Sequence, residues 1–208
     1  SMSAWFFYIF GKAERIIRTG MMGQGELFMA ERAGGAWLAV GILGLWGTRR
    51  HLGNVGKKFL NPKVPIDDSN EPMGYRTAVT GLTFGLIGLT LFSLQAGMTW
   101  WGICGFAVIF LLMAIGVTRI RAESGPPSHE ILALDPARLM TVVFGSRLVG
   151  TSNLTIISFY YWLNRLNVSH PMPNQLEAFK IAERAQINSR HLIWVMMLSI
   201  ILGTLASF

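Results

Sequence analysis

The sequence has a single cysteine, Cys104, and few charged residues. One cysteine cannot form a disulfide within the chain, and it cannot supply a cysteine-cluster metal site. Asp, Glu, Lys and Arg together make up 14% of the residues, whereas about 25% is typical of a soluble globular domain. The low charge argues against an ordinary water-exposed surface.

Motifs of several common enzyme classes are also absent. The sequence has no G-x-S-x-G nucleophile elbow and no H-E-x-x-H zinc motif. Residues 51–58 only faintly resemble a phosphate loop, because His51 replaces its first glycine and Lys58 replaces its Ser or Thr. We therefore predict that the chain is not an enzyme, and the sequence identifies no cofactor.

Long apolar stretches dominate the sequence instead. Apolar residues make up 51% of the chain, and the mean hydropathy is +0.43. A helix needs about 20 mainly apolar residues to cross a bilayer, and the stretches at about 26–47, 75–96, 99–118 and 191–208 approach that length. The apolar residues run continuously rather than alternating with polar ones, which favours membrane-spanning helices over the strands of a β-barrel. We predict an all-α, polytopic helical membrane protein with about four full transmembrane helices, forming a single transmembrane domain over residues 1–208.

The distribution of positive charge predicts how the chain is oriented. The net charge is +7, from 18 Lys and Arg against 11 Asp and Glu, and the positive residues gather beside the apolar stretches. This pattern is typical of cytoplasmic loops rather than of a nucleic-acid footprint. Residues 95–99 contain no Lys or Arg, whereas residues 48–76, predicted to be mainly a polar connection, contain six. We expect 48–76 to be cytoplasmic, 95–99 to be external, and no nucleic acid to bind.

The region after the third apolar stretch has a different pattern. Pro126 and Pro127 interrupt a helix, and Asp135 followed by Pro136 favours a new helix start. The next apolar stretch, 154–163, has only ten residues and is too short for a straight span. A full crossing would also put the positive residues that follow it outside, against the positive-inside rule. We therefore predict a broken or re-entrant helical segment over 136–168.

An amphipathic helix is predicted over 174–188. Asn174 can cap its start, with Glu177 three residues later to complete a capping box. Its apolar stripe comprises Leu176, Phe179, Ala182 and Ala185.

Two features of the N-terminal half leave alternatives open. Residues 4–10 are rich in aromatics, which fits either an interfacial segment or the end of a helix. Glu31 and Arg32 stand near the start of the first apolar stretch, either at membrane depth against protein or water, or at the interface.

The glycines at 41, 44 and 47, and those at 81, 85 and 88, predict faces for close helix packing.

The candidate site lies in residues 119–184, where charged residues flank interrupted apolar segments. Charge at membrane depth and broken apolar segments are both typical of a solute or ion pathway. Salt bridging and snorkelling at helix ends explain the same charges without a pathway. A metal site of carboxylates and imidazoles is a less favoured alternative, and no metal is predicted. The candidate pathway residues are Arg119, Arg121, Glu123, His129, Glu130, His170, Gln175 and Glu177.

Two motifs resemble a known family. The first runs Arg-Ala-Glu-x-Gly-Pro-Pro-x-His over residues 121–129, and the second runs His-Pro-Met-Pro-x-Gln-Leu-Glu over residues 170–177. Residues 67–76, "DDSNEPMGYR", are similar too. The chain resembles an uncharacterised family of multi-spanning bacterial and archaeal membrane proteins, distantly similar to the oligopeptide transporter superfamily. The resemblance implies the inner (cytoplasmic) membrane and a longer protein with more spans on its N-terminal side.

The leading hypothesis is a membrane transporter, or part of one, for a small polar solute, peptide or metal chelate. The alternative is a non-catalytic membrane subunit that packs in a larger membrane complex, as the glycine faces and small size suggest. An intramembrane metal-dependent enzyme is a third and weaker possibility. The partners expected are the lipid bilayer and either other membrane proteins or further copies of the chain.

Overall fold

The computed structural model describes residues 2–22, 29–61, 64–65, 71–125, 135–164 and 170–207. Within these ranges the chain is helical and has no strand, which confirms the all-α prediction. The helices are α1 (Met2–Met22), α2 (Met29–Leu60), α3 (Tyr75–Gln95), α4 (Trp100–Ser124), α5 (Pro136–Phe144), α6 (Ser146–Val149), α7 (Thr151–Phe159), α8 (Tyr161–Asn164), α9 (Pro171–Arg184) and α10 (Ser189–Ala206).

Three of the described helices are long and apolar enough to cross a membrane. They are Tyr75–Gln95, Trp100–Glu123 and Ser189–Ala206, which supports an integral membrane protein. The predicted first span, 26–47, lies mainly within α2, which is not one of the three. Charged residues limit the apolar part of α2 at both ends, from Arg32 to Arg49.

Helix α2 also extends further than the sequence suggested. Residues 48–60, predicted to be part of a polar connection, continue the helix to Leu60. No proline interrupts this stretch, and the helix stops just before Asn61, which precedes Pro62 and is therefore disfavoured in helical conformation. Near the end of α2, His51 packs edge-on against Tyr75 at the start of α3, with ring centroids 5.6 Å apart.

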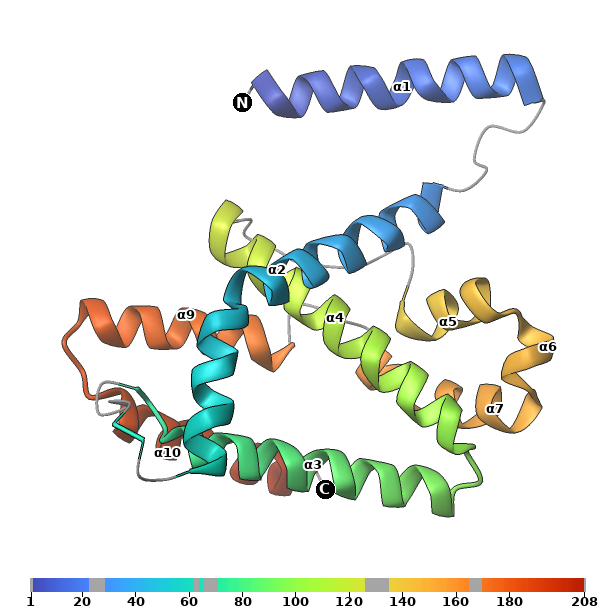
Figure 1. Cartoon of the computed structure of the whole chain (residues 1–208). Helices are drawn as coiled ribbons and strands as arrows, with labels where there is room; N and C mark the ends of the chain where they lie inside the picture. The colour runs from blue at the N-terminus through green and yellow to red at the C-terminus, as the bar shows by residue number, and fades with distance from the viewer. Residues whose placement is uncertain are drawn as a thin grey trace.

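Helices α2 and α4 cross in close contact (Figure 1). A Cβ atom built on Gly41 would lie 2.2 Å from the backbone oxygen of Leu112, and one on Gly116 would lie 2.7 Å from that of Trp37. Only glycine allows backbones to approach this closely. The packing role predicted for Gly41 is therefore confirmed.

The glycines of α3 do not make the contacts predicted for them. A Cβ built on Gly81, Gly85 or Gly88 would meet no atom of the described chain within 4 Å. All three glycines are exposed, so no described part of the chain packs against this face of α3.

The buried core lies between α4 and the short helices that follow it. Met113, Ala114 and Val117 of α4 pack with Met140 of α5 and Ile157 of α7 in one apolar cluster. The segment that begins with α5 therefore folds back beside α4 (Figure 1).

The predicted broken segment consists of α5 to α8. Asp135 caps α5 as expected, because its side chain accepts a hydrogen bond from the Arg138 amide at 2.7 Å. The breaks on either side of α6 fall at Gly145 and Gly150, with φ of 78° and 79°. These backbone conformations favour glycine strongly, so the two glycines explain why no continuous helix forms.

The boundaries of the predicted amphipathic helix are corrected by the structure. Helix α9 begins at Pro171, because His170, not Asn174, is its N-cap: His170 Nδ1 accepts from the Met172 amide at 3.2 Å. It ends at Arg184. Asn188, predicted to end this helix, caps α10 instead, and its side chain accepts from the Arg190 amide at 3.0 Å.

Candidate functional site

The candidate site centres on an ion pair between α4 and α9. Arg121, in the last turn of α4, donates a hydrogen bond from Nε to Oε1 of Glu177. The Arg121 side chain is 15% exposed and that of Glu177 is 44% exposed. Both residues were predicted to line the pathway, and the structure brings them together across 56 positions of sequence.

These two side chains line a groove with a volume of about 590 Å³. Helices α4 and α9 supply most of its wall, with Ser189 from the start of α10 and Pro72 from before α3 completing it. The groove is chemically mixed, with three cationic side chains, two carboxylates and an apolar part. Its lining residues are Pro72, Arg121, Ala122, Leu176, Glu177, Phe179, Lys180, Glu183, Arg184 and Ser189.

A second, exposed ion pair lies on the α9 wall of the groove. Lys180 Nζ donates to Glu183 Oε2 at 2.7 Å. This hydrogen bond, with the positive charge of Lys180 and a smaller contribution from Arg184, holds the pKa of the Glu183 carboxyl below its ordinary value. Glu183 therefore stays ionised at neutral pH, and the groove keeps both signs of charge.

Arg119 and Glu123 form a separate pair that does not line this groove. Arg119 Nε donates to Glu123 Oε1 at 2.8 Å, one turn apart on α4. The Arg119 side chain runs beside α2, where its Cδ atom lies 3.4 Å from the position of a Cβ on Gly44. Of this pair, Arg119 contributes to packing against α2, and Glu123 is largely exposed.

His170 and Gln175 also lie away from the groove lining. His170 is buried, caps α9, and its ring stacks on Phe110 of α4 at 6.1 Å between centroids. This geometry gives His170 a role in docking α9 onto α4. Gln175, half-buried on α9, is not part of the groove lining.

His129 and Glu130, also predicted as pathway residues, lie outside the residues that the structure describes. Among the described residues, no group of three or more His, Cys, Asp and Glu side chains is placed to hold a metal ion.

A buried polar cluster that sequence reasoning missed lies at the other end of α4. Asn153 of α7 is 2% exposed. Its Oδ1 accepts from the Thr99 amide at 2.8 Å, and its Nδ2 donates to Thr99 Oγ1 and to the Val149 carbonyl, both at 2.7 Å. Nearby, Ser152 Oγ donates to the Gly97 carbonyl at 2.6 Å. These bonds fasten α7 to the turn between α3 and α4.

A second buried contact closes the same region. Ser93 of α3 and the hydroxyl of Tyr160 lie 2.7 Å apart, and the Tyr160 ring stacks on Phe106 of α4. The segment that follows α4 thus reaches the Thr99 end of α4 and returns to the Arg121 end through α9. Asn153 stands with Thr151 and Ser152 just before the short apolar stretch 154–163, and nothing in the sequence marks it, rather than these polar neighbours, as a buried contact.

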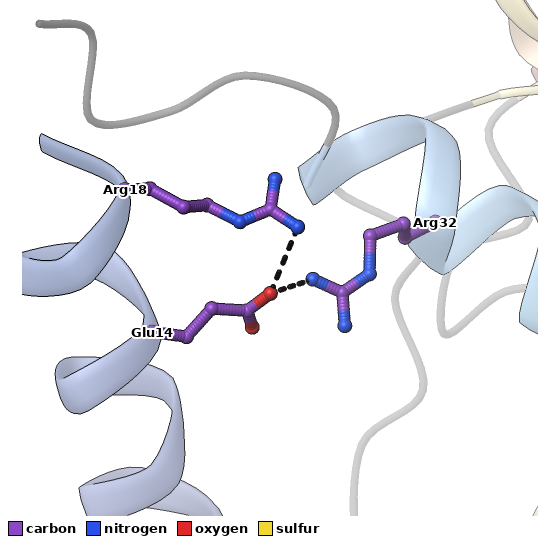
Figure 2. Close-up of polar contacts among 3 residues, drawn as sticks. All are labelled: Glu14, Arg18 and Arg32. Carbon is purple, nitrogen blue, oxygen red and sulfur yellow. Dashed lines mark hydrogen bonds and ion pairs between the residues drawn. The ribbon is translucent and has the colours of Figure 1, made fainter. Parts of the chain in front are cut away.

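The N-terminal helix is joined to α2 by charge. Figure 2 shows Glu14 of α1 between Arg18 of the same helix and Arg32 of α2. Arg18 Nη2 lies 3.0 Å from Glu14 Oε1, and Arg32 Nη1 donates to the same oxygen. Arg32 therefore contacts α1, and both alternatives for its depth in a membrane stay predictions.

Comparison with known proteins gives a family but no activity. The chain matches a family of unknown function (DUF6785) over residues 1–208, so it belongs to that family. No curated protein and no solved structure matches it.

Proposed function

We propose that this member of the family is a membrane transporter, or the transporting part of one, for a small polar solute such as a peptide or a metal chelate. The observation that carries the proposal is the groove at the Arg121 end of α4, lined by the Arg121–Glu177 pair. Charged groups at the end of a membrane-length helix are costly unless they are paired or used. Here they are paired across two helices and face a volume of about 590 Å³.

The chemistry of the groove favours a solute that carries both charges. Arg121, Lys180 and Arg184 suit a carboxylate, while Glu177 and Glu183 suit an ammonium group. The apolar wall, which includes Phe179, suits a side chain between the two. A short peptide has this arrangement of groups, and its binding would exchange protein ion pairs for protein–solute pairs.

The broken helices support the same proposal. Transporters bind solutes where helices are interrupted, because interruption allows polar groups and movement inside a membrane domain. In this chain the segment α5 to α9 is interrupted repeatedly and contacts both ends of α4, through Asn153 and through Glu177. It resembles a re-entrant element more closely than a straight span.

The membrane placement that we propose follows the distribution of charge. Residues 48–76 face the cytoplasm of a bacterium or archaeon, and the turn at 95–99 faces outward across the inner membrane. The groove then lies on the cytoplasmic side, with Arg121. The apolar part of α2 acts as a fourth span, in addition to α3, α4 and α10. Transport without chemical conversion makes the chain a non-enzyme, and the kinship with oligopeptide transporters remains a prediction.

Uptake into proteoliposomes tests the proposal. The full chain is reconstituted, and uptake of labelled di- and tripeptides and of a ferric chelate is compared with uptake into protein-free liposomes. We expect saturable uptake of at least one of these solutes, and a large loss with Glu177→Gln. Glu123→Gln is the matched control, since it also neutralises a carboxylate paired with an arginine but lies outside the groove. No saturable uptake, or equal uptake by both variants, would contradict the proposal.

A second candidate function rests on a different observation. The glycine face of α3 meets nothing in the described chain, and no residue of α10 is buried. Exposed glycine faces on apolar helices are typical of helix association in membranes, which favours a non-catalytic subunit of a larger membrane complex or a homo-oligomer. Gentle purification followed by mass measurement in detergent tests it, and a monodisperse monomer without partners and with full uptake activity would contradict it.

A further inference from the structure

Helix α1 has one apolar side and one basic side. At 3.6 residues per turn, most of its bulky apolar residues share one side of the helix. Phe7 and Tyr8 are the exceptions, because they lie on the basic side, where Lys12 stands over the Tyr8 ring. The opposite side carries Lys12, Arg15 and Arg18, with Glu14 near its edge. The residues of the apolar side are Trp5, Phe6, Ile9, Phe10, Ile16, Ile17 and Met21.

The apolar side of α1 is exposed over its whole length. Its members are 54–81% exposed, from Phe10 at the lower limit to Met21 at the upper. Aromatic rings gather toward its N-terminal end, where Phe6 stacks on Phe10 at 6.3 Å between centroids. A continuous apolar side of this size is unfavourable in water, so another medium or molecule must cover it.

The contact with α2 leaves this side uncovered. Glu14 holds Arg32 of α2 at the polar edge of α1 (Figure 2), and α1 lies away from the remaining helices (Figure 1). The Glu14 carboxylate is therefore engaged by Arg18 and Arg32. Three cations and this one neutralised carboxylate leave the basic side with a positive balance.

We propose that α1 lies flat in the interface of a membrane that contains acidic phospholipids, with its apolar side among the upper acyl chains. Basic amphipathic helices with aromatic residues bind such surfaces through both forces, apolar burial and attraction to anionic headgroups. The charge on the polar side selects this occupant over a second copy of the chain, which carries the same charge of +7. A bilayer is also the expected surrounding of the chain, since α3, α4 and α10 are long and apolar enough to cross it.

The ion pair between Glu14 and Arg32 then has a positioning role. It fixes the polar edge of α1 to the first turn of α2. The apolar side is thereby turned away from α2 and toward the surface on which the helix rests.

The test uses fluorescent probes at two neighbouring positions of α1 in the full chain. Cys104→Ser removes the native cysteine. Ile17→Cys then places a thiol-reactive fluorophore on the apolar side, and Thr19→Cys places it on the basic side at almost the same height along the helix. Both positions are exposed. The labelled chains are reconstituted in nanodiscs of phosphatidylcholine, with or without phosphatidylglycerol, and quenched by spin-labelled lipid or by aqueous iodide.

We expect lipid quenching and a blue shift at position 17, and iodide quenching at position 19. Phosphatidylglycerol should strengthen lipid quenching at position 17, and Lys12→Gln with Arg15→Gln should remove that gain. Equal responses at the two positions would overturn the proposal. Protection of position 17 from both quenchers would also overturn it, because protein would then cover the apolar side. Lipid quenching at position 17 that does not change with phosphatidylglycerol would contradict the role of acidic lipid.

Discussion

Arg121 and Glu177 join α4 to α9 through a hydrogen bond from the guanidinium Nε to the carboxylate Oε1. The two residues lie 56 positions apart, on either side of the broken segment. Because the pair faces the groove and also bridges two helices, it has two separable roles. One is to brace α9 against α4, and the other, in the function that we propose, is to present charge to a solute in the groove.

The bracing role predicts thermodynamic coupling between Arg121 and Glu177. Arg121→Gln and Glu177→Gln should each lower the melting temperature in detergent. The decrease in the double variant should be smaller than the sum of the two single decreases, because either change alone already breaks the pair. The matched control is the exposed pair on α9, Lys180 and Glu183. Lys180→Gln and Glu183→Gln should show little coupling, since exposed pairs within one helix contribute little to stability. Additive effects at Arg121 and Glu177 would show that the pair does not brace the helices.

The crossing of α2 and α4 predicts a strong effect at Gly41. A methyl group there would lie 2.2 Å from the Leu112 carbonyl oxygen, so Gly41→Ala must push the helices apart. We expect a loss of about 1–3 kcal/mol, the usual cost of overpacking. Gly85→Ala on α3 is the control, since its Cβ meets nothing within 4 Å in the described chain. It should be neutral or stabilise the isolated chain by up to about 1 kcal/mol, because alanine is the better helix former. Unfolding in mixed micelles measures both, and equal stability of the two variants would refute the crossing.

The buried amide of Asn153 predicts a third effect. Asn153→Ala removes the part-buried bonds to Thr99 and the buried bond to the Val149 carbonyl, and the Thr99 amide loses its partner. Burial without a partner costs about 1–3 kcal/mol. Thr155→Ala, two residues along on the exposed side of α7, removes only a bond to the backbone of its own helix. It should change stability by less than about 0.5 kcal/mol. Limited proteolysis near residues 96–99 should speed up in the first variant and not in the second.

Local signals predicted part of this structure well. Asp135 before Pro136 marks the start of α5, and α5 begins there, because capping depends on a few neighbouring residues. The small size of Gly41 likewise predicts close helix contact, and α4 makes that contact. The limits of such signals appear at α9, where Asn174 was the predicted cap but His170 is the observed one. Docking of His170 against Phe110 accompanies this earlier start.

The pairing of charged side chains at the candidate site could not be predicted from the sequence. The charges of Arg121 and Glu177 were recognisable as costly near a membrane-length helix, but their partners depend on how the intervening segment folds back. Arg119 has the same charge and nearly the same position in the sequence, yet it turns toward α2 and pairs with Glu123. Two residues correspond to about 200° of rotation around a helix, so Arg119 and Arg121 lie on opposite faces of α4. The packing of α2 and α9 around α4 determines which of the two arginines lines the groove.

A charge exchange between Arg121 and Glu177 tests the central claim most directly. In the double variant Arg121→Glu with Glu177→Arg, the pair can form again with reversed polarity. The measurement is solute uptake into proteoliposomes beside the melting temperature of the same preparation. If the groove charges contact the solute, the melting temperature should recover toward that of the unmodified chain while uptake stays low. Recovery of uptake together with stability would contradict the account, because the pair would then only brace two helices.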